Sequence, residues 1–504
     1  MISNITKWLD TTTKKYPEKI AVCDETGQID FKDFRKKALA VAREIICMGT
    51  DTKKPIVIYL GKSAKVLVSF AAVAYSGNFY SPIDIDMPEI RVKKIIEVLK
   101  PEIVITDDKG KLNFQKYGFS GKYIIYESVA SAKDDEEIVK NIQAKIIDTD
   151  LLYVLFTSGS TGVPKGVSIM HRSVIDYIDW VTETFGITER DRFGNQAPFY
   201  FDNSILDIYC MMKTGATLYI IPKELFAQPV LLLEYIRENR INNIFWVPSA
   251  LIMVSKVKAF RNVNLMEILE RVLFCGEVMP NKQLNIWRKY LPNCLFANLY
   301  GPTEITDACT CYIVDREFSD DESLPIGMPM KNTEILILDE ENRLITESGR
   351  AGELCVRGTC LSVGYYNNPE KTKQAFVQNP LQRAYEEKIY RTGDIVKYNA
   401  RKEIVYLSRK DFQIKHLGHR IELGEIETAV SSLDEISMCC CLYDEMRNKI
   451  VLFLDKEISK EIVNAELRKM IPDYMLPGKV ICMDKLPLNV NGKVDRVKLK
   501  EYIE

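Results

Sequence analysis

Short apolar runs alternate with amphipathic stretches along most of the first 300 residues. Within residues 30–48, the apolar side chains of Ala38, Val41 and Ile45 recur every three or four positions, which predicts a helix with one buried face. The same reasoning predicts strands over 55–60, 79–83 and 102–106 and helices over 63–76 and 88–99. Strands that alternate with helices form parallel sheets covered by those helices, so we expect that arrangement here.

The alternation pauses once and then resumes. Residues 107–148 are polar and weakly patterned, and we expect them to form a surface excursion. Beyond them, strands are predicted over 153–156, 193–197, 216–221, 243–247, 271–275 and 295–300, and helices over 171–185, 204–213, 229–239, 249–260 and 280–290. Two βα blocks in succession predict two stacked sheets of related design.

The pattern changes near residue 325. Short β-rich runs at 334–338, 353–356 and 404–407 are separated by Gly and Asn turns, which predicts a small, mostly antiparallel subdomain. A charged run at 408–420 leads into a compact α+β segment.

A chain of 504 residues is too long for one hydrophobic core, so we expect an α/β protein of two domains. The large N-terminal domain, residues 1–410, contains two stacked βα sheets and the β-rich subdomain. The small C-terminal domain, residues 411–504, is expected to be α+β, and its boundary lies near Asp411.

The composition is that of a globular protein that stays in water. Hydrophobic residues make up 46% and charged residues 27% of the chain, and the formal net charge of −2 gives no argument for a nucleic-acid partner. We expect no membrane insertion, because the longest apolar stretch, 66–75, is too short to cross a bilayer. The 13 cysteines form no spaced framework, and reduced thiols indicate the cytoplasm. We therefore expect a cytoplasmic protein, and we take it to be a monomer.

Residues suited to ligand binding are most concentrated in the loop 157–166, TSGSTGVPKG, which follows a predicted buried strand. Its glycines allow backbone N–H groups to approach a ligand closely, its hydroxyls add donors, and Lys165 adds a positive charge. This set suits an anion such as a phosphate. The loop lacks the Walker pattern, because Pro164 precedes the lysine and no Ser or Thr follows it. The alternative is a solvated Gly/Ser turn.

Five further stretches suit a ligand, although each has a simpler explanation. Residues 201–204, FDNS, place a carboxylate before an apolar helix, or cap that helix. Residues 298–304, NLYGPTE, offer an aromatic face, a hydroxyl and a carboxylate for a base and a magnesium ion, or form a Gly-Pro turn. Residues 390–394, YRTGD, present a carboxylate for ribose hydroxyls, or form a surface turn. Residues 418–427 place carboxylates at a helix start, and 491–496, NGKVDR, form a basic or solvated turn.

Together and in this order, these stretches resemble the adenylate-forming superfamily, and within it the amino-acid-adenylating enzymes. That group includes the adenylation domains of nonribosomal peptide synthetases and the D-alanine–carrier protein ligases. The matching motifs also include GELCVRG at 352, DFQIK at 411 and IPDYMLP at 471. The D-alanine ligases are the closest likeness, on FCGE at 274–277 and SVGY at 362–365.

The resemblance implies that the protein binds ATP and Mg²⁺, forms an acyl-adenylate, releases pyrophosphate and passes the acyl group to a thiol. It implies a catalytic role for Lys493, Lys165 and Glu304, with Glu304 at the metal and Lys493 at the substrate carboxylate and the α-phosphate. Residues implied to hold ATP are Thr157, Ser158, Gly159, Ser160, Thr161, Gly162, Lys165, Gly276, Glu277, Asn298, Tyr300, Gly301, Thr303, Asp394, Arg409 and Lys493. Among them, Tyr300 stacks on adenine and Asp394 holds the ribose.

The resemblance also implies an amino acid as substrate, because a carboxylate at the position of Asp202 pairs with the α-ammonium group in these enzymes. The implied substrate residues are Asp202, Asn203, Leu206, Phe245, Leu273, Cys275, Leu299, Asp307 and Ala308. D-Alanine is the best guess, although Asp307 is a carboxylate where the D-alanine ligases are apolar. The alternatives are another polar or basic amino acid for nonribosomal peptide synthesis, an acyl- or aryl-CoA ligase, and a catalytically dead nucleotide-binding scaffold.

Two chemical steps at one site imply two positions of the C-terminal domain about Asp411. One presents Lys493 for adenylation, and the other presents the face around Gly418 to a phosphopantetheine arm. No carrier module follows Arg496, so we expect the thiol on a separate phosphopantetheinylated carrier protein.

Overall fold

The structure, a computed structural model, describes residues 2–49, 51–130, 136–159, 162–320, 322–433, 436, 438–488 and 494–503. The chain folds into two compact units. The first comprises Met1–Ile85, Lys100–Leu155 and Val167–Lys410, and the second comprises Asp86–Leu99, Phe156–Gly166 and Asp411–Glu504.

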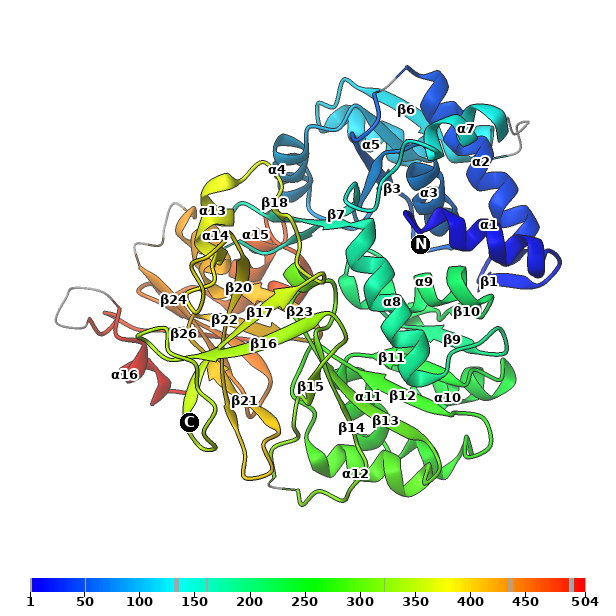
Figure 1. Cartoon of the computed structure of the whole chain (residues 1–504). Coiled ribbons are helices and arrows are strands. Elements are labelled where there is room, and N and C mark those ends of the chain that lie inside the picture. The colour runs from blue at the N-terminus through cyan, green and yellow to red at the C-terminus, as the bar shows by residue number, and fades with distance from the viewer. Residues whose placement is uncertain are drawn as a thin grey trace. The chain divides into compact units, whose positions relative to one another are not determined.

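Nine strands form the larger sheet of the first unit (Figure 1). In spatial order they are β15 (Met328–Pro329), β14 (Thr310–Ile313), β13 (Leu295–Tyr300), β12 (Arg271–Phe274), β11 (Asn243–Trp246), β9 (Arg192–Asn195), β10 (Thr217–Ile220), β1 (Ile20–Asp24) and β2 (Gly27–Asp30). The strands from β13 to β1 run parallel, and β2, β14 and β15 add antiparallel edges.

The two faces of this sheet belong to different apolar cores. Consecutive residues of a strand point to opposite faces. Phe245 therefore joins the main core of the first unit, whereas Trp246 joins a second core. The second core is covered by α10 (Pro229–Glu238), α11 (Pro248–Lys256) and α12 (Asn281–Tyr290).

Seven strands form the second sheet, which shares the main core with the first. In spatial order they are β18 (Gly364–Tyr365), β8 (Lys165–Met170), β7 (Leu151–Thr157), β4 (Phe79–Pro82), β3 (Pro55–Tyr59), β5 (Ile103–Thr106) and β6 (Lys122–Ile125). The main core also holds the helices α1 (Thr6–Lys15), α2 (Phe31–Cys47), α3 (Ala64–Tyr75), α8 (His171–Phe185) and α9 (Ile205–Thr214). Helix α3 touches β1 of the first sheet and β3 and β4 of the second, so it lies between the sheets.

A smaller antiparallel sheet completes the first unit. Its strands are β16 (Thr333–Leu338), β17 (Ala351–Gly358), β20 (Lys388–Tyr398), β19 (Phe376–Gln378) and β21 (Ile404–Arg409), joined by the helix α13 (Pro369–Ala375). Strand β20 lies at the centre and pairs with β17, β19 and β21.

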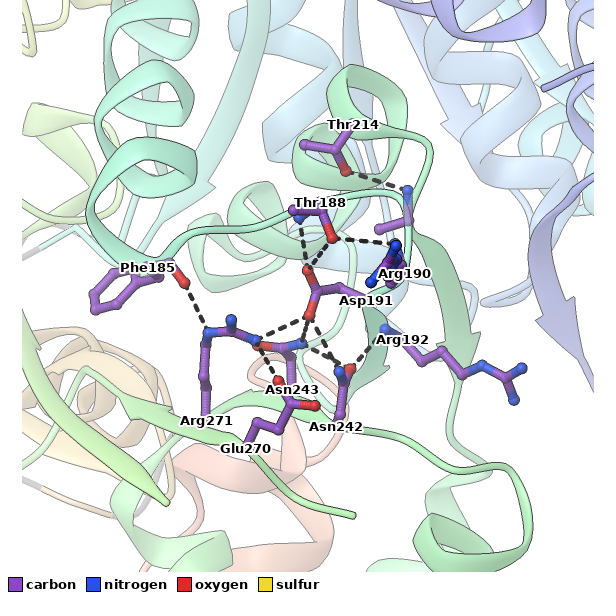
Figure 2. Close-up of polar contacts among 11 residues, drawn as sticks. Phe185, Thr188, Arg190, Asp191, Arg192, Thr214, Asn242, Asn243, Glu270 and Arg271 are labelled. Atoms are coloured by element: carbon purple, nitrogen blue, oxygen red, sulfur yellow. Dashed lines mark hydrogen bonds and ion pairs between the residues drawn. The ribbon is translucent and has the colours of Figure 1, made fainter. Parts of the chain in front are cut away.

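A buried aspartate ties together the amino ends of three parallel strands (Figure 2). Asp191 precedes β9, and its Oδ1 accepts hydrogen bonds from Asn243 Nδ2 at 2.8 Å and from Arg271 Nη1 at 2.9 Å. Its Oδ2 accepts from the Thr188 N–H at 2.6 Å. Arg271 Nε also donates to the Phe185 carbonyl at 2.7 Å, which ties in the end of α8. The opposite, carboxyl ends of these strands are therefore left to the loops, where α/β proteins bind ligands.

The second unit has its own apolar core, formed by side chains such as Ile421, Ile426, Leu452 and Leu467. Its strands and helices are β22 (Gln413–His416), β23 (His419–Glu422), β24 (Cys439–Asp444), β25 (Lys449–Leu454), β26 (Lys479–Cys482), α4 (Glu89–Leu99), α14 (Leu423–Ser431), α15 (Lys460–Leu467) and α16 (Arg496–Lys500). Strands β22 and β23 form a hairpin, and β24, β25 and β26 form a three-stranded sheet.

The predicted α/β fold is confirmed, including the two large sheets and the antiparallel one. The surface excursion predicted for 107–148 is wrong. This stretch contains α5 (Asp108–Lys116), β6, α6 (Tyr126–Val129) and α7 (Glu136–Gln143). Strand β6 lies at a sheet edge and only its Ile124 is fully buried, so it lacks the apolar run that marks a central strand. The helix predicted over 249–260 ends earlier, at Lys256.

Short 3-10 turns interrupt the regular pattern. They are η1 (Asp202–Ser204), η2 (Lys223–Ala227), η3 (Ala259–Arg261), η4 (Thr303–Ile305) and η5 (Asp473–Met475). In the described part of the chain, no helix is long and apolar enough to cross a membrane.

Candidate active site

The predicted ribose site is a buried carboxylate between two donors. Asp394, on β20, is 2% exposed. Its Oδ1 accepts a hydrogen bond from Arg409 Nη1 at 2.7 Å, and its Oδ2 accepts from the Tyr300 hydroxyl. Arg409 also donates to the Thr392 carbonyl at 3.0 Å, which fixes its guanidinium group. Burial raises the pKa of Tyr300 well above its usual value, so the phenol keeps its proton and remains a donor.

Tyr300, Asp394 and Arg409, all predicted at the nucleotide, therefore contact one another, although they lie far apart in the sequence. Tyr300 ends β13, while Asp394 and Arg409 face each other across β20 and β21. A ribose diol at Asp394 has to share the carboxylate with Tyr300 and Arg409, or displace them.

Glu304 lies in η4 and is fully buried. Its Oε1 accepts from the Tyr365 hydroxyl at 2.7 Å, and its backbone carbonyl accepts from the Ser362 N–H at 2.8 Å. The neighbouring Thr303 is also buried. A carboxylate beside a hydroxyl is a hard oxygen donor set, which suits Mg²⁺ shared with phosphate oxygens. Within the described residues, no three or more His, Cys, Asp or Glu side chains gather into a metal site of their own.

Other residues predicted to bind the nucleotide stabilise the local backbone conformation. Glu277 Oε2 accepts from the Ser249 N–H at 2.8 Å, at the beginning of α11. Asn298 Nδ2 donates to the Pro325 carbonyl at 2.8 Å. A Cβ atom on Gly301 would lie 2.5 Å from the α-carbon of Ala308, so only glycine fits this turn.

The predicted substrate residues gather at the carboxyl ends of the parallel strands. Phe245 on β11 pairs in register with Leu273 on β12, and Cys275 directly follows β12. Leu299 lies near the end of β13, and Leu206 is a buried residue in the first turn of α9. These five side chains are buried in the main core, as is Ala308.

Two carboxylates lie among these apolar residues. Asp202 is 8% exposed and belongs to η1, together with the half-buried Asn203. The N-cap of α9 is Ser204, so Asp202 does not cap that helix. Asp307 follows η4 and is 1% exposed, and its Oδ2 accepts from the Tyr177 hydroxyl at 2.7 Å. Burial raises the pKa of Asp307 well above its usual value, and the nearby charge of Asp202 adds to this.

The loop predicted to hold phosphates belongs to the second unit, where it contacts carboxylates. Lys165 Nζ lies 3.1 Å from Glu422 Oε1, and the Gly159 N–H donates to Glu425 Oε2 at 3.1 Å. The Ser158 hydroxyl donates to the Arg420 carbonyl at 2.7 Å. The ammonium and N–H groups of this loop therefore engage anionic oxygen atoms, which is the chemistry expected of a phosphate site.

Helix α4 adds two basic residues to this arrangement. Arg91 forms an ion pair with Glu425, and both side chains are almost fully buried. Lys94 Nζ donates to the Gly162 carbonyl at 2.7 Å. Local sequence motifs do not predict Arg91, Glu422 and Glu425 as partners of the loop, because all three lie far from it along the chain.

Three predicted residues cannot be placed. Ser160, Thr161 and Lys493 lie outside the described residues. Thr157, at the start of the loop, is half-buried. Asp411, the predicted hinge, accepts a hydrogen bond from the Gln413 N–H at 3.2 Å and begins the last segment of the second unit.

Residues 9–366 match the AMP-binding enzyme family. The chain belongs to this family. An AMP-binding enzyme needs groups for a nucleotide; Tyr300 and Glu304 lie within the matched region, whereas Asp394 lies beyond its end.

Curated relatives of this AMP-binding enzyme include proteins much longer than this chain and proteins of similar length. Tyrocidine synthase 1 of Brevibacillus parabrevis is 31% identical over 503 residues, which cover 99% of this chain but 45% of that protein. The chain thus spans less than half the length of that relative. The D-alanine--D-alanyl carrier protein ligase of Bacillus cytotoxicus is 30% identical over 522 residues, which cover 99% of this chain and 98% of that protein.

Solved structures confirm the fold of the AMP-binding enzyme. The Vibrio cholerae adenylation domain AlmE, solved in complex with glycyl-adenosine-5'-phosphate, is 20% identical and superimposes with a TM-score of 0.85, covering 100% of this chain and 98% of that chain. IdnL1 is 23% identical with a TM-score of 0.81, covering 97% of this chain and 99% of that chain.

Proposed function

We propose that this AMP-binding enzyme activates an amino acid with ATP, forms aminoacyl-AMP, releases pyrophosphate, and transfers the aminoacyl group to the phosphopantetheine thiol of a separate carrier protein. The full-length match to a D-alanine--D-alanyl carrier protein ligase supports this reaction. D-Alanine is the first substrate to test, because Leu273, Cys275 and Ala308 suit a small side chain.

The observation that carries the proposal is the buried carboxylate of Asp202. It lies in the loop after β9, beside strands whose carboxyl ends carry Phe245 and Leu273. A carboxylate in apolar surroundings favours a cationic partner, and the α-ammonium group of an amino acid is such a partner. A fatty or aromatic acid has no cation to offer there.

The adenylation step brings two anions together. The substrate carboxylate attacks the α-phosphorus of ATP, a P–O bond forms, and the bond to pyrophosphate breaks. No general base is needed, because a carboxylate is ionised at neutral pH. The main requirement is fixed positive charge near the forming bond, and we assign it to Lys493 and Lys165. Glu304 would hold Mg²⁺, which would supply further positive charge when it is bound.

We further propose that the contacts of the phosphate loop alternate between the two half-reactions. Glu422 and Glu425 engage the Lys165 ammonium and the Gly159 N–H. These groups cannot hold a polyphosphate and the carboxylates at the same time. The arrangement with carboxylates therefore belongs to the transfer step, after pyrophosphate has left, and the C-terminal segment swings about Asp411 between the steps.

The test is an ATP–pyrophosphate exchange assay with D- and L-amino acids, fatty acids and aromatic acids. We expect exchange with amino acids only. Exchange supported only by fatty or aromatic acids would show an acyl- or aryl-CoA ligase instead, and no exchange with any acid would show a catalytically dead scaffold.

Lys493→Ala separates the two half-reactions. We expect it to abolish exchange and to leave transfer from supplied aminoacyl-AMP largely intact, because only adenylation needs this cation. Lys485→Ala, at an exposed lysine of the same segment, is the matched control and should keep both activities. An equal loss of both activities in Lys493→Ala would refute the two-position mechanism.

A further inference from the structure

Asp307 is a buried carboxylate with one oxygen atom left unpaired. Its Oδ2 accepts the hydrogen bond from Tyr177, whereas its Oδ1 has no hydrogen-bond partner among the described residues. The backbone here is unusual, since Thr306 and Asp307 both have a positive φ, 63° and 73°. Two successive residues other than glycine in this region store strain, and such strain is concentrated at functional sites.

A second buried acid lies in the same part of the first unit. Asp207, on α9, is fully buried, and its Oδ2 accepts from Asn195 Nδ2 at 3.0 Å while its Oδ1 also lacks a partner among the described residues. Asp202 and Asp207 both lie close enough to Asp307 for their charges to raise the pKa of its carboxyl group. Three buried acids, Asp202, Asp207 and Asp307, therefore lie near one another, and the charge of Lys62 reaches Asp207.

A buried acceptor without a donor destabilises the protein, and the effect is larger when the group is charged. The methyl group of alanine cannot satisfy Asp307 Oδ1, and an aliphatic side chain would desolvate it further. A substrate that brings its own donor removes this cost. An amine does so best, because it adds a positive charge to a site that already holds several acids.

Resting on the proposed amino-acid adenylation, we propose that the substrate is an amino acid whose side chain carries an amine, which donates to Asp307. The two cations of such a diamino acid match two carboxylates, with the α-ammonium group at Asp202 and the side-chain amine at Asp307. Tyr177 is a positioning residue, because its hydroxyl holds Asp307 Oδ2 and leaves Oδ1 for the substrate.

The experiment measures kcat/KM for exchange with both enantiomers of alanine, serine, 2,3-diaminopropionate, 2,4-diaminobutyrate, ornithine and lysine. We expect at least one diamino acid to exceed alanine of the same handedness by at least about tenfold. Asp307→Asn keeps the shape and removes the charge, and it should lower kcat/KM for that diamino acid by at least about tenfold while changing that for alanine by less than about threefold.

Two further variants separate a direct role of Asp307 from a general loss of structure or charge. Tyr177→Phe should reduce the preference for the diamino acid over alanine, through KM rather than kcat. Asp207→Asn makes the same charge change on α9, where the side chain pairs with Asn195, and should reduce that preference by less than Asp307→Asn does.

The outcomes are distinguishable. The inference is wrong, while amino-acid adenylation stands, if alanine or another amino acid without a side-chain amine is the best substrate. The same holds if Asp307→Asn lowers kcat/KM equally for all substrates. If no amino acid supports exchange, the proposed function itself is wrong, and the inference is lost with it.

Discussion

Replacing Glu422 with glutamine tests whether carboxylates and polyphosphate compete for the phosphate loop. Lys165 Nζ lies 3.1 Å from Glu422 Oε1, and the side chains are 13% and 12% exposed. Two unit charges at this distance attract by about 5 kcal/mol at an effective dielectric constant of about 20. Most of this is offset by the loss of hydration of both groups, so that a hydrogen bond to a charged group contributes a net of about 1.5–3 kcal/mol.

Glu422→Gln keeps the size of the side chain and removes its charge, so it weakens the competing contact without touching the lysine. A loss of about 1.5 kcal/mol from the competing contact strengthens polyphosphate binding by about tenfold, provided that the contact dominates in the free protein. We therefore expect the Kd of inorganic pyrophosphate, measured by calorimetry, to fall by about tenfold. Transfer from supplied aminoacyl-AMP should slow, because the arrangement assigned to that step is destabilised.

Two controls make this result specific. Glu466→Gln removes a carboxylate that pairs with Lys469 at 2.7 Å on the exposed surface of the same unit, and it should leave the Kd unchanged. In a Lys165→Ala background, Glu422→Gln should no longer strengthen binding, because the shared partner is gone. An unchanged Kd in the single variant, or an equal gain in the Lys165→Ala background, would refute the competition.

Two further predictions concern stability. Asp191→Ala should lower the free energy of unfolding by about 3–5 kcal/mol in urea titrations, because it removes the buried acceptor shared by Asn243, Arg271 and the Thr188 N–H. Glu466→Ala should lower it by less than about 1 kcal/mol, and equal effects would contradict the role given to Asp191. His171 is buried, its Nδ1 accepts from the Ile5 N–H at 3.4 Å, and burial lowers its pKa from 6.5 to about 4. Between pH 6.5 and 4 the unfolded chain therefore binds a proton that the folded chain does not, so stability rises with pH. Acidification across this window should lower the free energy of unfolding by about 3 kcal/mol. His171→Gln should flatten that part of the plot of stability against pH.

Local patterns predict the elements of this fold well where apolar spacing is regular. The predicted helix over 171–185 coincides with α8, and the predicted strand over 295–300 coincides with β13. Prediction fails where an element has few buried residues. Strand β6 and helix α7 have one fully buried side chain each, Ile124 and Val139, so their sequences look like polar loops.

The candidate site likewise contains residues that the sequence predicts and partners that it does not. Glu304 and Asp394 stand out in the sequence because each follows a glycine in a short polar motif, although the turn predicted over 390–394 is wrong, since these residues belong to strand β20. Their partners do not, since Tyr365 reaches Glu304 from 61 positions away and Tyr177 reaches Asp307 from 130 positions away. Such contacts depend on the order of strands in the sheets, which local spacing does not encode. The resemblance to a family supplies the motif residues, but not the side chains that position them.

Competition at one loop also orders the proposed reaction. If the groups that bind pyrophosphate are those that Glu422 and Glu425 engage, the transfer arrangement cannot form until pyrophosphate has dissociated. The carrier thiol therefore reaches the aminoacyl-AMP only after pyrophosphate has left. Without pyrophosphate, adenylation cannot run in reverse. The buried ion pair between Arg91 and Glu425 stabilises the arrangement in which the carboxylates contact the loop. The same contacts that complete the second unit thus favour the forward direction, and excess pyrophosphate opposes transfer by taking the place of the two carboxylates.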